Sequence, residues 1–338
     1  MTKKERVINS FNHIESDIIP YHADFTTQEH DRLAVFTGDP HFADKYGNHL
    51  HYMQYWGWPT ETTRKEFFLD EFGVTWNRTG ADKDIGVIDT PIISKPNIKL
   101  WREPKLDEGR LRAEFQSVID NAGDCFTLAG IGFSMFERSW SLCGMENILM
   151  YMIDEPDFLH ELLDTICEYN LKIIDIANEY PFDGFYFGDD WGQQRGLIMG
   201  PKCWREYIRP RVSCMYEHAH KNGKYVIQHS CGDIHELFPD LIEIGLNCYQ
   251  TFQPEIYDIE KVKSEFGKDL TFWGGISTQQ LLPNASAEEV RQETARIMKI
   301  MGKGGGYIAA PTHAVPNDVP PENILAMFDV FMNQERYF

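Results

Sequence analysis

The sequence predicts a (β/α)8 barrel, the TIM-barrel fold, as one domain over residues 1–338. Short apolar segments alternate with amphipathic helical segments in the second half of the chain, which is typical of parallel strands joined by helices. The apolar segments are apolar throughout, so we expect each strand to be covered on both faces. The pattern yields seven or eight such strands, and this number favours a closed barrel over an open sheet.

The predicted elements begin with a polar helix at about residues 3–13. The strand segments are residues 18–25, 125–133, 183–192, 224–233, 246–254, 270–277 and 306–314. Helical patterns lie between most of the later strands, at residues 201–223, 233–245, 258–267 and 286–304. The last helix begins with Ser286 and Glu289 at the spacing of a capping box, and we expect Gly302 to cap its other end.

The composition excludes several classes of protein. A net charge of −20 argues against binding to nucleic acid and to anionic membranes, both of which require clustered Lys and Arg. The chain has no apolar run of about 18 residues, so we expect no membrane span. Its first residues lack the apolar centre of a signal peptide, and its seven cysteines include no CxxC pair. We therefore expect a cytoplasmic protein with free thiols.

Polar side chains follow the predicted strands at the positions where each strand ends. Chemistry in (β/α)8 barrels takes place at the C-terminal ends of the strands, so these residues define a candidate site. They are Asp24, Glu137, Asp189, Asp190, His229, Cys231, Gln250, Gln253, Trp273 and His313.

A metal site is the sharpest hypothesis for this ring of residues. His229 and Cys231 are two apart, so an extended backbone places both on one face, and Gly232 then allows the chain to turn away. An imidazole and a thiolate are zinc ligands, and His313 ends the last strand at the same mouth. Three such ligands would leave one zinc position open, as in catalytic sites. The alternative is a buried Cys beside an incidental His.

The remaining candidates are assigned to catalysis or substrate binding. Asp189 and Asp190 are neighbours, so only one of them is expected to enter the cavity as a catalytic carboxylate; a helix N-cap is the alternative role. The aromatic candidates Tyr186, Phe187, Trp191 and Trp273 are expected to line a small apolar pocket. Asp24, Glu137, Gln250 and Gln253 are expected to contact the substrate.

Long segments of the chain also resemble a known family. They are KKERVINSFNHIESDIIP, FERSWSLCGMENILMYM, GDDWGQQRGLIMGPKCWREYIRPR, HSCGDIHELFPDLIEIG, LTFWGGISTQ and GGGYIAAPTHAVPNDVPPENI. Together they resemble the uroporphyrinogen decarboxylase-like superfamily, and most of all its branch of zinc-dependent corrinoid methyltransferases. The resemblance covers nearly the whole chain and implies a (β/α)8 barrel.

Two chemistries compete within this superfamily. The decarboxylases carry a paired-arginine motif near the N-terminus, where this chain has YHADFTTQEHDRL with only Arg32. His313 does fall where the decarboxylases have a histidine. The methyltransferases carry His-x-Cys and a distant Cys; His229 and Cys231 match, whereas His313 stands in the third place.

The resemblance therefore implies a zinc methyltransferase acting on a small methylated substrate and a corrinoid carried by a partner protein. One Cys and two neutral His leave zinc more positive than two Cys would, which favours polarising a substrate oxygen or nitrogen over activating a thiolate. Asp189 or Asp190 would orient the substrate or handle a proton. A decarboxylase-type lyase, a methylcorrinoid:thiol methyltransferase and a non-catalytic ligand-binding barrel remain the alternatives.

Overall fold

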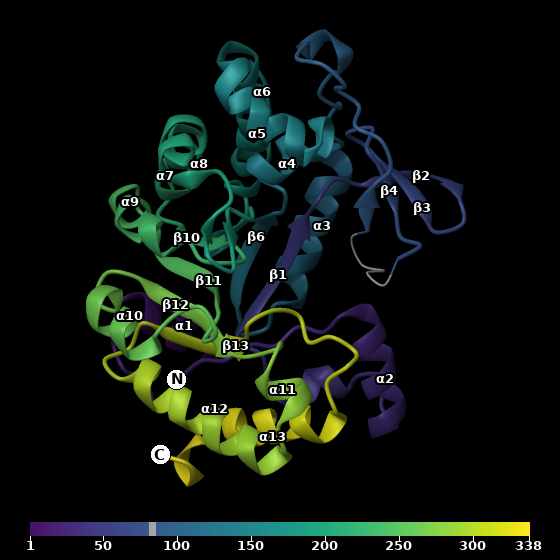
Figure 1. Cartoon of the computed structure of the whole chain (residues 1–338). Helices are drawn as coiled ribbons and strands as arrows, with labels where there is room; N and C mark the ends of the chain where they lie inside the picture. The colour runs from purple at the N-terminus through teal and green to yellow at the C-terminus, as the bar shows by residue number, and fades with distance from the viewer. Residues whose placement is uncertain (81–85) are drawn as a thin grey trace.

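The fold is a parallel barrel, described in the computed structural model for residues 1–80 and 86–338, with the backbone alone at 61–63. Seven strands form its wall in the order β1 (Leu50–Tyr55), β6 (Phe126–Ile131), β7 (Gly184–Gly188), β10 (Tyr225–His229), β11 (Cys248–Phe252), β12 (Thr271–Ile276) and β13 (Tyr307–Pro311). Every pairing between them is parallel. Figure 1 shows helices around this curled sheet. The predicted (β/α)8 barrel is confirmed.

The eighth wall position is taken by residues 18–25, which the sequence predicts as a strand. The segment forms only two isolated bridges, Tyr21 with Ala309 and Phe25 with Val315. On its other side the Tyr21 carbonyl accepts the His49 amide at 3.0 Å. The Asn48 side chain then takes both backbone groups of Ala23, at 3.0 and 2.9 Å, in place of a second strand bond. The segment therefore closes the barrel without being a regular strand.

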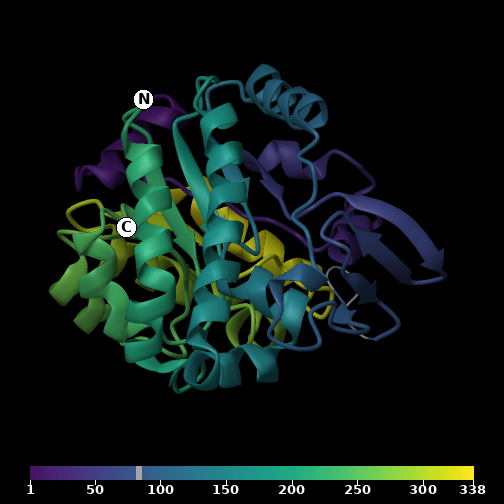
Figure 2. The same ribbon diagram turned by 90° about the horizontal axis from the view of Figure 1, so that it is seen from above.

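The outer helices follow the strands along the chain. They are α3 (Glu108–Asn121), α4 (Phe136–Cys143), α5 (Met145–Asp154), α6 (Pro156–Ala177), α7 (Gly200–Cys203), α8 (Arg209–His220), α9 (Phe238–Glu243), α10 (Ile259–Phe266), α11 (Leu281–Asn284), α12 (Ala287–Gly302) and α13 (Pro321–Met332). Figure 2 shows the long helices side by side along one flank. A π-helical turn, η3 (Trp204–Ile208), precedes α8. None of the helices of the described chain is both long and apolar enough to cross a membrane.

The N-terminal helix α1 (Lys3–Phe11) closes the barrel at the N-terminal ends of its strands. Its buried Val7 and Phe11 pack with the interior side chains Leu50, Phe126 and Ile227. The helix was expected to reach residue 13 but ends at Phe11, and His13 adopts a φ of 55° that no helix continues. The polar helix of the sequence is thus a plug with one apolar face.

The last long helix, α12, confirms one expectation and corrects another. Ser286 and Glu289 form the predicted capping box. Gly302 is the last helical residue and does not cap the helix, because Lys303 follows it with extended backbone. A Cβ on Gly302 would lie 2.3 Å from Cδ1 of Ile19, so Gly302 packs closely against the Ile19 side chain.

The sequence analysis did not foresee the region between residues 26 and 100. It holds α2 (Thr27–Thr37), η1 (Phe42–Tyr46), the barrel strand β1, and η2 (Ile98–Leu100). It also holds an antiparallel sheet of β2 (Pro59–Arg64), β3 (Phe67–Asp70), β4 (Thr75–Asn77) and β5 (Val87–Ile88), which projects from the barrel in Figure 1. Buried Arg138 ties this sheet to α4, since it pairs with Asp70 at 3.5 Å and donates to the Trp56 carbonyl at 2.6 Å.

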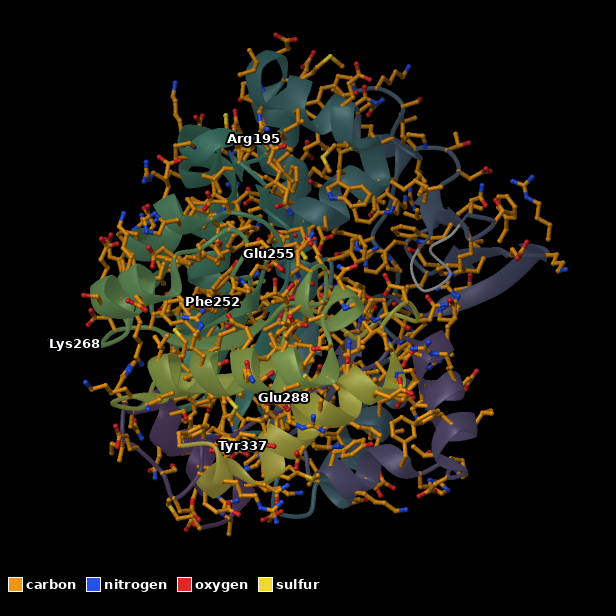
Figure 3. The ribbon with its side chains drawn as sticks, turned by 60° about the horizontal axis from the view of Figure 1, so that its bottom comes forward. Arg195, Phe252, Glu255, Lys268, Glu288 and Tyr337 are labelled. Carbon is orange, nitrogen blue, oxygen red and sulfur yellow. The ribbon has the colours of Figure 1, made fainter. Side chains whose placement is uncertain are left out.

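The C-terminal layer is seen in Figure 3, which looks onto α12 and α13. Glu288 marks the start of α12, and Tyr337 near the chain end donates to Asp329 of α13 at 2.6 Å. Phe252 lies inside the molecule at the end of β11, whereas Lys268 lies at its edge. Helix α12 packs on β12 and β13, and α13 packs on α12.

Candidate metal centre

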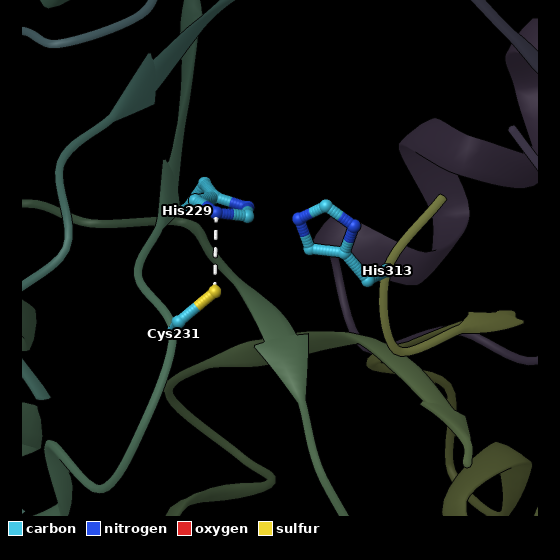
Figure 4. Close-up of side chains that lie close together, drawn as sticks. All are labelled: His229, Cys231 and His313. Carbon is cyan, nitrogen blue, oxygen red and sulfur yellow. Dashed lines mark hydrogen bonds between the residues drawn. The ribbon is translucent and has the colours of Figure 1, made fainter. Parts of the chain in front are cut away.

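Three metal-ligating side chains meet at the mouth of the barrel. His229 is the last residue of β10, Cys231 lies two residues further along the chain, and His313 lies just beyond β13. One ligand atom from each lies within 4.8 Å of the other two, and no other such group of three occurs among the described residues. Figure 4 shows the imidazole of His313 approaching the His229 and Cys231 pair from across the mouth.

The donor set fits a zinc ion. Sγ of Cys231 lies 3.7 Å from Nε2 of His229. Zinc bonds of about 2.3 Å to sulfur and about 2.1 Å to nitrogen, at a tetrahedral angle, would separate the two atoms by about 3.6 Å. The three ligand atoms all lie within 4.8 Å of one another, so His313 would need to approach by roughly 1 Å at most to complete the set.

The second nitrogen of His229 is already engaged, which leaves Nε2 for a metal. Oε1 of Gln250 lies in hydrogen-bond contact with Nδ1 of His229 and also accepts from the Tyr186 hydroxyl at 2.8 Å. An amide oxygen only accepts, so Nδ1 carries a proton, and in the neutral ring that binds a metal Nε2 has the lone pair. Second partners of this kind orient metal-bound histidines in many proteins. Gln250 is therefore a positioning residue for His229.

Asp190 borders the same three side chains. Its Oδ1 accepts the Cys231 amide at 2.8 Å and lies 3.4 Å from Nε2 of His229. Burial opposes ionisation, but the bonds from His229 and Cys231 hold the pKa of Asp190 below its usual value.

Gly232 has a φ of 78°, and a Cβ there would meet the backbone of Gly192 at 2.2 Å. This close approach packs the loop after β10 against the loop after β7.

Asp189 points the other way and serves α4. Its carboxylate accepts the amides of Met135, Phe136 and Glu137 at 3.3, 2.9 and 2.8 Å, and it also accepts from the indole of Trp191. Burial nonetheless raises the pKa of Asp189 to about 6. The structure thus places only one carboxylate of the pair beside the metal ligands, and the other accepts the amides at the start of α4 from outside that helix.

Glu137 lies on the first turn of α4, close to both aspartates. Burial, followed by the charges of Asp190 and Asp189, raises its pKa well above the usual value. These effects favour the neutral form of Glu137.

An aromatic floor lies below the metal ligands. Tyr52, Tyr186 and Trp273 are mutual neighbours, with ring centroids 5.3 to 6.1 Å apart. His22 meets Trp273 edge to face at 5.5 Å and lies 3.0 Å from Oδ1 of Asp24. The indole nitrogen of Trp273 has no partner among the described residues. The floor therefore offers a buried donor to a ligand.

Three predicted substrate contacts have partners within the fold. Phe187 faces outward from β7 and stacks on Tyr216 of α8, because alternate residues of a strand face opposite sides. Trp191 is fully buried and packs against Trp204. The Gln253 side chain accepts the Gly232 amide at 3.3 Å and holds the loop after β10. The expectation that Phe187 and Trp191 line the pocket does not hold, whereas the substrate contact of Gln253 stays a prediction.

His22 and Tyr52 are site residues that the sequence reasoning missed. Tyr52 lies on β1, which was not recognised as a strand. His22 stands two residues before Asp24, the same spacing that singled out His229 and Cys231. That spacing was the available signal, since both side chains then share a face.

Fold and site together define a (β/α)8 barrel with a candidate metal centre at the C-terminal ends of its strands. Residues 70–333 match the sequence profile of the family described as uroporphyrinogen decarboxylase (URO-D). The chain belongs to this family.

Relatives within reach of sequence comparison are enzymes of two kinds. A uroporphyrinogen decarboxylase of Psychromonas ingrahamii is 23% identical over 50% of this chain and 46% of its own. A methylated-thiol--coenzyme M methyltransferase of Methanosarcina mazei is 20% identical over 56% of this chain and 49% of its own. The chain thus spans about half the length of these relatives. Among solved structures, a methyltransferase from Methanosarcina mazei matches all of both chains with a TM-score of 0.73 at 16% identity, which bears on the fold.

Proposed function

We propose that this protein is a zinc-dependent methyltransferase that moves a methyl group between a small methylated substrate and a corrinoid carried by a partner protein. The observation that carries the proposal is the convergence of His229, Cys231 and His313 at the barrel mouth. The methyltransferase relative from Methanosarcina mazei supports the reaction class.

The composition of the ligand set indicates what a bound zinc would supply. With a single thiolate, the ion would keep more positive charge than with two, and it would act as a Lewis acid toward an oxygen or nitrogen of the substrate. Gln250 would keep Nε2 of His229 aimed at the ion, and Asp190 would hold the Cys231 backbone in place.

The surrounding side chains supply binding and a proton. Tyr52, Tyr186 and Trp273 would bear the apolar part of the substrate, and the free indole N–H of Trp273 would take an acceptor atom. Neutral Glu137 is the group able to give a proton to a leaving oxygen or nitrogen. Asp190, which lies close to Glu137, would take up a proton when the reaction runs in the opposite direction.

A decarboxylase on the same barrel is less well supported. Arg32, the arginine of the N-terminal segment, pairs with the fully buried Glu29 at 2.8 Å and also donates to the Val319 carbonyl. It is committed to this ion pair and is not presented to a carboxylate-rich substrate at the mouth.

Metal content is the first test. Protein purified without added metal should contain about one zinc per chain, and the His313→Ala variant should lose it. His218→Ala is the matched control, because Nδ1 of His218 bonds only the Cys214 carbonyl and thiol of its own helix. A well-folded wild-type protein without zinc would refute the proposal.

Direction is tested with a Co(I) corrinoid protein and a panel of methyl ethers and methylated amines. We expect methylation of the cobalt, which is monitored by the change in absorbance of the corrinoid. Methyl transfer only to thiols would instead support the methylcorrinoid:thiol reaction.

A further inference from the structure

Two glycines stand at inward-facing positions of the barrel wall close to the candidate metal centre. Gly130 of β6 lies two residues after the interior side chain of Leu128, and Gly188 of β7 lies two residues after that of Tyr186. Gly188 is also the register partner of His229 on β10. At this level β6 and β7 therefore contribute no side chain to the interior.

Gln54 of β1 fills the space that these glycines leave. It lies two residues after Tyr52, whose ring packs in the interior, so Gln54 also faces inward. A Cβ on Gly130 would meet Cγ of Gln54 at 2.9 Å, and a Cβ on Gly188 would meet its amide nitrogen at 3.1 Å. The side chain thus crosses β6 and ends over β7. Because neighbouring strands lie about 4.8 Å apart, its carboxamide ends one strand away from His229.

The carboxamide of Gln54 has no hydrogen-bond partner among the described residues, and the residue is half-buried. The other glutamines of the wall strands, Gln228 and Gln250, both bond to protein groups. A carboxamide has two N–H donors and an oxygen that accepts, and polar groups that are withdrawn from water are normally paired. An aliphatic side chain would fill the space over two glycines equally well. The amide therefore calls for a partner that enters the mouth.

A small molecule at the metal ligands would reach Gln54 from the mouth. Trp56, two residues further along the chain, is 40% exposed, and its ring lies over Gly132, 2.8 Å from where a Cβ would stand. The indole thus flanks Gln54 on the solvent side. The Asp190 side chain, two residues after Gly188, is 33% exposed. The space between the carboxamide and the metal ligands is therefore open to a ligand.

We propose that Gln54 is a specificity-determining residue, which binds a neutral hydrogen-bonding group of the substrate, such as a hydroxyl, a few atoms from the methylated oxygen or nitrogen. This inference rests on the proposed function, and it narrows the substrate to methyl donors that carry a second polar group. A hydroxyl both donates and accepts, as does the carboxamide. A carboxylate in this place is disfavoured by the net charge of −20.

The test compares two probes that differ at one end, 3-methoxypropan-1-ol and 1-methoxybutane, in which a methyl group replaces the hydroxyl. Saturation-transfer NMR with the full chain gives the ratio of their affinities. Gln54→Met keeps the volume but removes the hydrogen bond, so the affinity for the hydroxyl probe relative to the methyl probe should fall about fivefold or more. Gln292→Met at an exposed position of α12 is the matched control, with an unchanged ratio. A wild-type ratio in Gln54→Met, or no saturable binding of the hydroxyl probe to the wild type, would overturn the proposal.

Gly188→Ala provides a second variant, in which Gln54 itself is intact. The added methyl group would stand 3.1 Å from the amide nitrogen, at the flexible end of the Gln54 side chain, and should displace it. The affinity ratio should then fall as in Gln54→Met, and thermal melts establish that each variant is folded. An unchanged ratio in folded Gly188→Ala would overturn the position assigned to the carboxamide.

Neither measurement uses zinc or a corrinoid, so this inference and the proposed function fail separately. A protein that contains no zinc but shows the change of ratio would refute the proposed function and leave Gln54 as a ligand-binding residue. A zinc protein that transfers methyl groups, with the same ratio in all variants, would refute the role of Gln54 alone.

Discussion

At the residue scale, the third metal ligand sets the charge on the proposed zinc. Replacing His313 by Cys keeps a ligand in place but adds one negative charge to the ion. We expect His313→Cys to retain about one zinc per chain and to gain methyl transfer to thiols, because a less positive zinc leaves a bound thiolate more nucleophilic. Metal analysis and a thiol-methylation assay measure both effects. Unchanged zinc content together with no thiol activity would show that the residue at position 313 does not set the charge on the metal.

Gln250 makes a second prediction at the same scale. Its Oε1 is the shared acceptor for His229 and Tyr186, so Gln250→Met removes the acceptor with little change of volume. We expect zinc affinity to fall about 10- to 100-fold, the usual cost of losing such an outer partner. Competition with a chromophoric chelator measures it. Tyr186→Phe is the control, since it removes only the other donor and should cost less than Gln250→Met does.

At the element scale, the neighbouring aspartates after β7 should separate stability from metal binding. Asp189 receives three amides at the start of α4, whereas Asp190 contacts His229 and Cys231. Asp189→Ala should lower the free energy of unfolding by at least about 2 kcal/mol, because it leaves buried amides without an acceptor. Asp190→Ala should lower stability less and zinc affinity more. Urea unfolding and zinc titration of both variants decide it, and the reverse ranking would contradict the assignment.

The same elements show what could be predicted from the sequence. The later strands were predictable because each is an apolar run ended by Gly or polar residues, and His229 and Cys231 share a face by simple alternation. The strand β1 was not, because its residues Leu50–Tyr55 mix histidine, tyrosine and glutamine and resemble a polar aromatic loop. The side chains of β1 that point inward at the level of the site, such as Tyr52, are polar. These site residues interrupt the apolar run by which a buried strand is recognised in a sequence.

The direction in which each strand side chain points was the second feature that the sequence could not predict. Phe187 and Tyr186 are neighbours on β7, and only their register relative to the barrel axis decides which one enters the interior. A single sequence fixes the alternation but not its phase. Tertiary pairing with β6 and β10 fixes that phase, and it turns Phe187 to the helices.

At the scale of the whole molecule, stability should depend on pH through a histidine at the base of the barrel. His49 is 1% exposed, its Nδ1 has no partner among the described residues, and Nε2 lies 3.5 Å from the guanidinium of Arg6. Burial, followed by the charges of Arg6 and Lys3, lowers the pKa of His49 to about 3. The ring therefore stays neutral in the folded chain at pH values where it is charged in the unfolded chain.

The sign follows from linkage. Between about pH 3 and about pH 6.5 the unfolded chain binds one more proton at His49 than the folded chain does, so stability falls as the pH falls through this range. His49→Gln cannot titrate, and its free energy of unfolding should vary less steeply with pH, by up to about 1.4 kcal/mol per unit. Urea unfolding from pH 4 to pH 8 measures the slope. His41→Gln, a substitution at an exposed histidine, is the control. A wild-type slope in His49→Gln would mean that the barrel base admits the proton, and that the plug formed by α1 does not shield this ring.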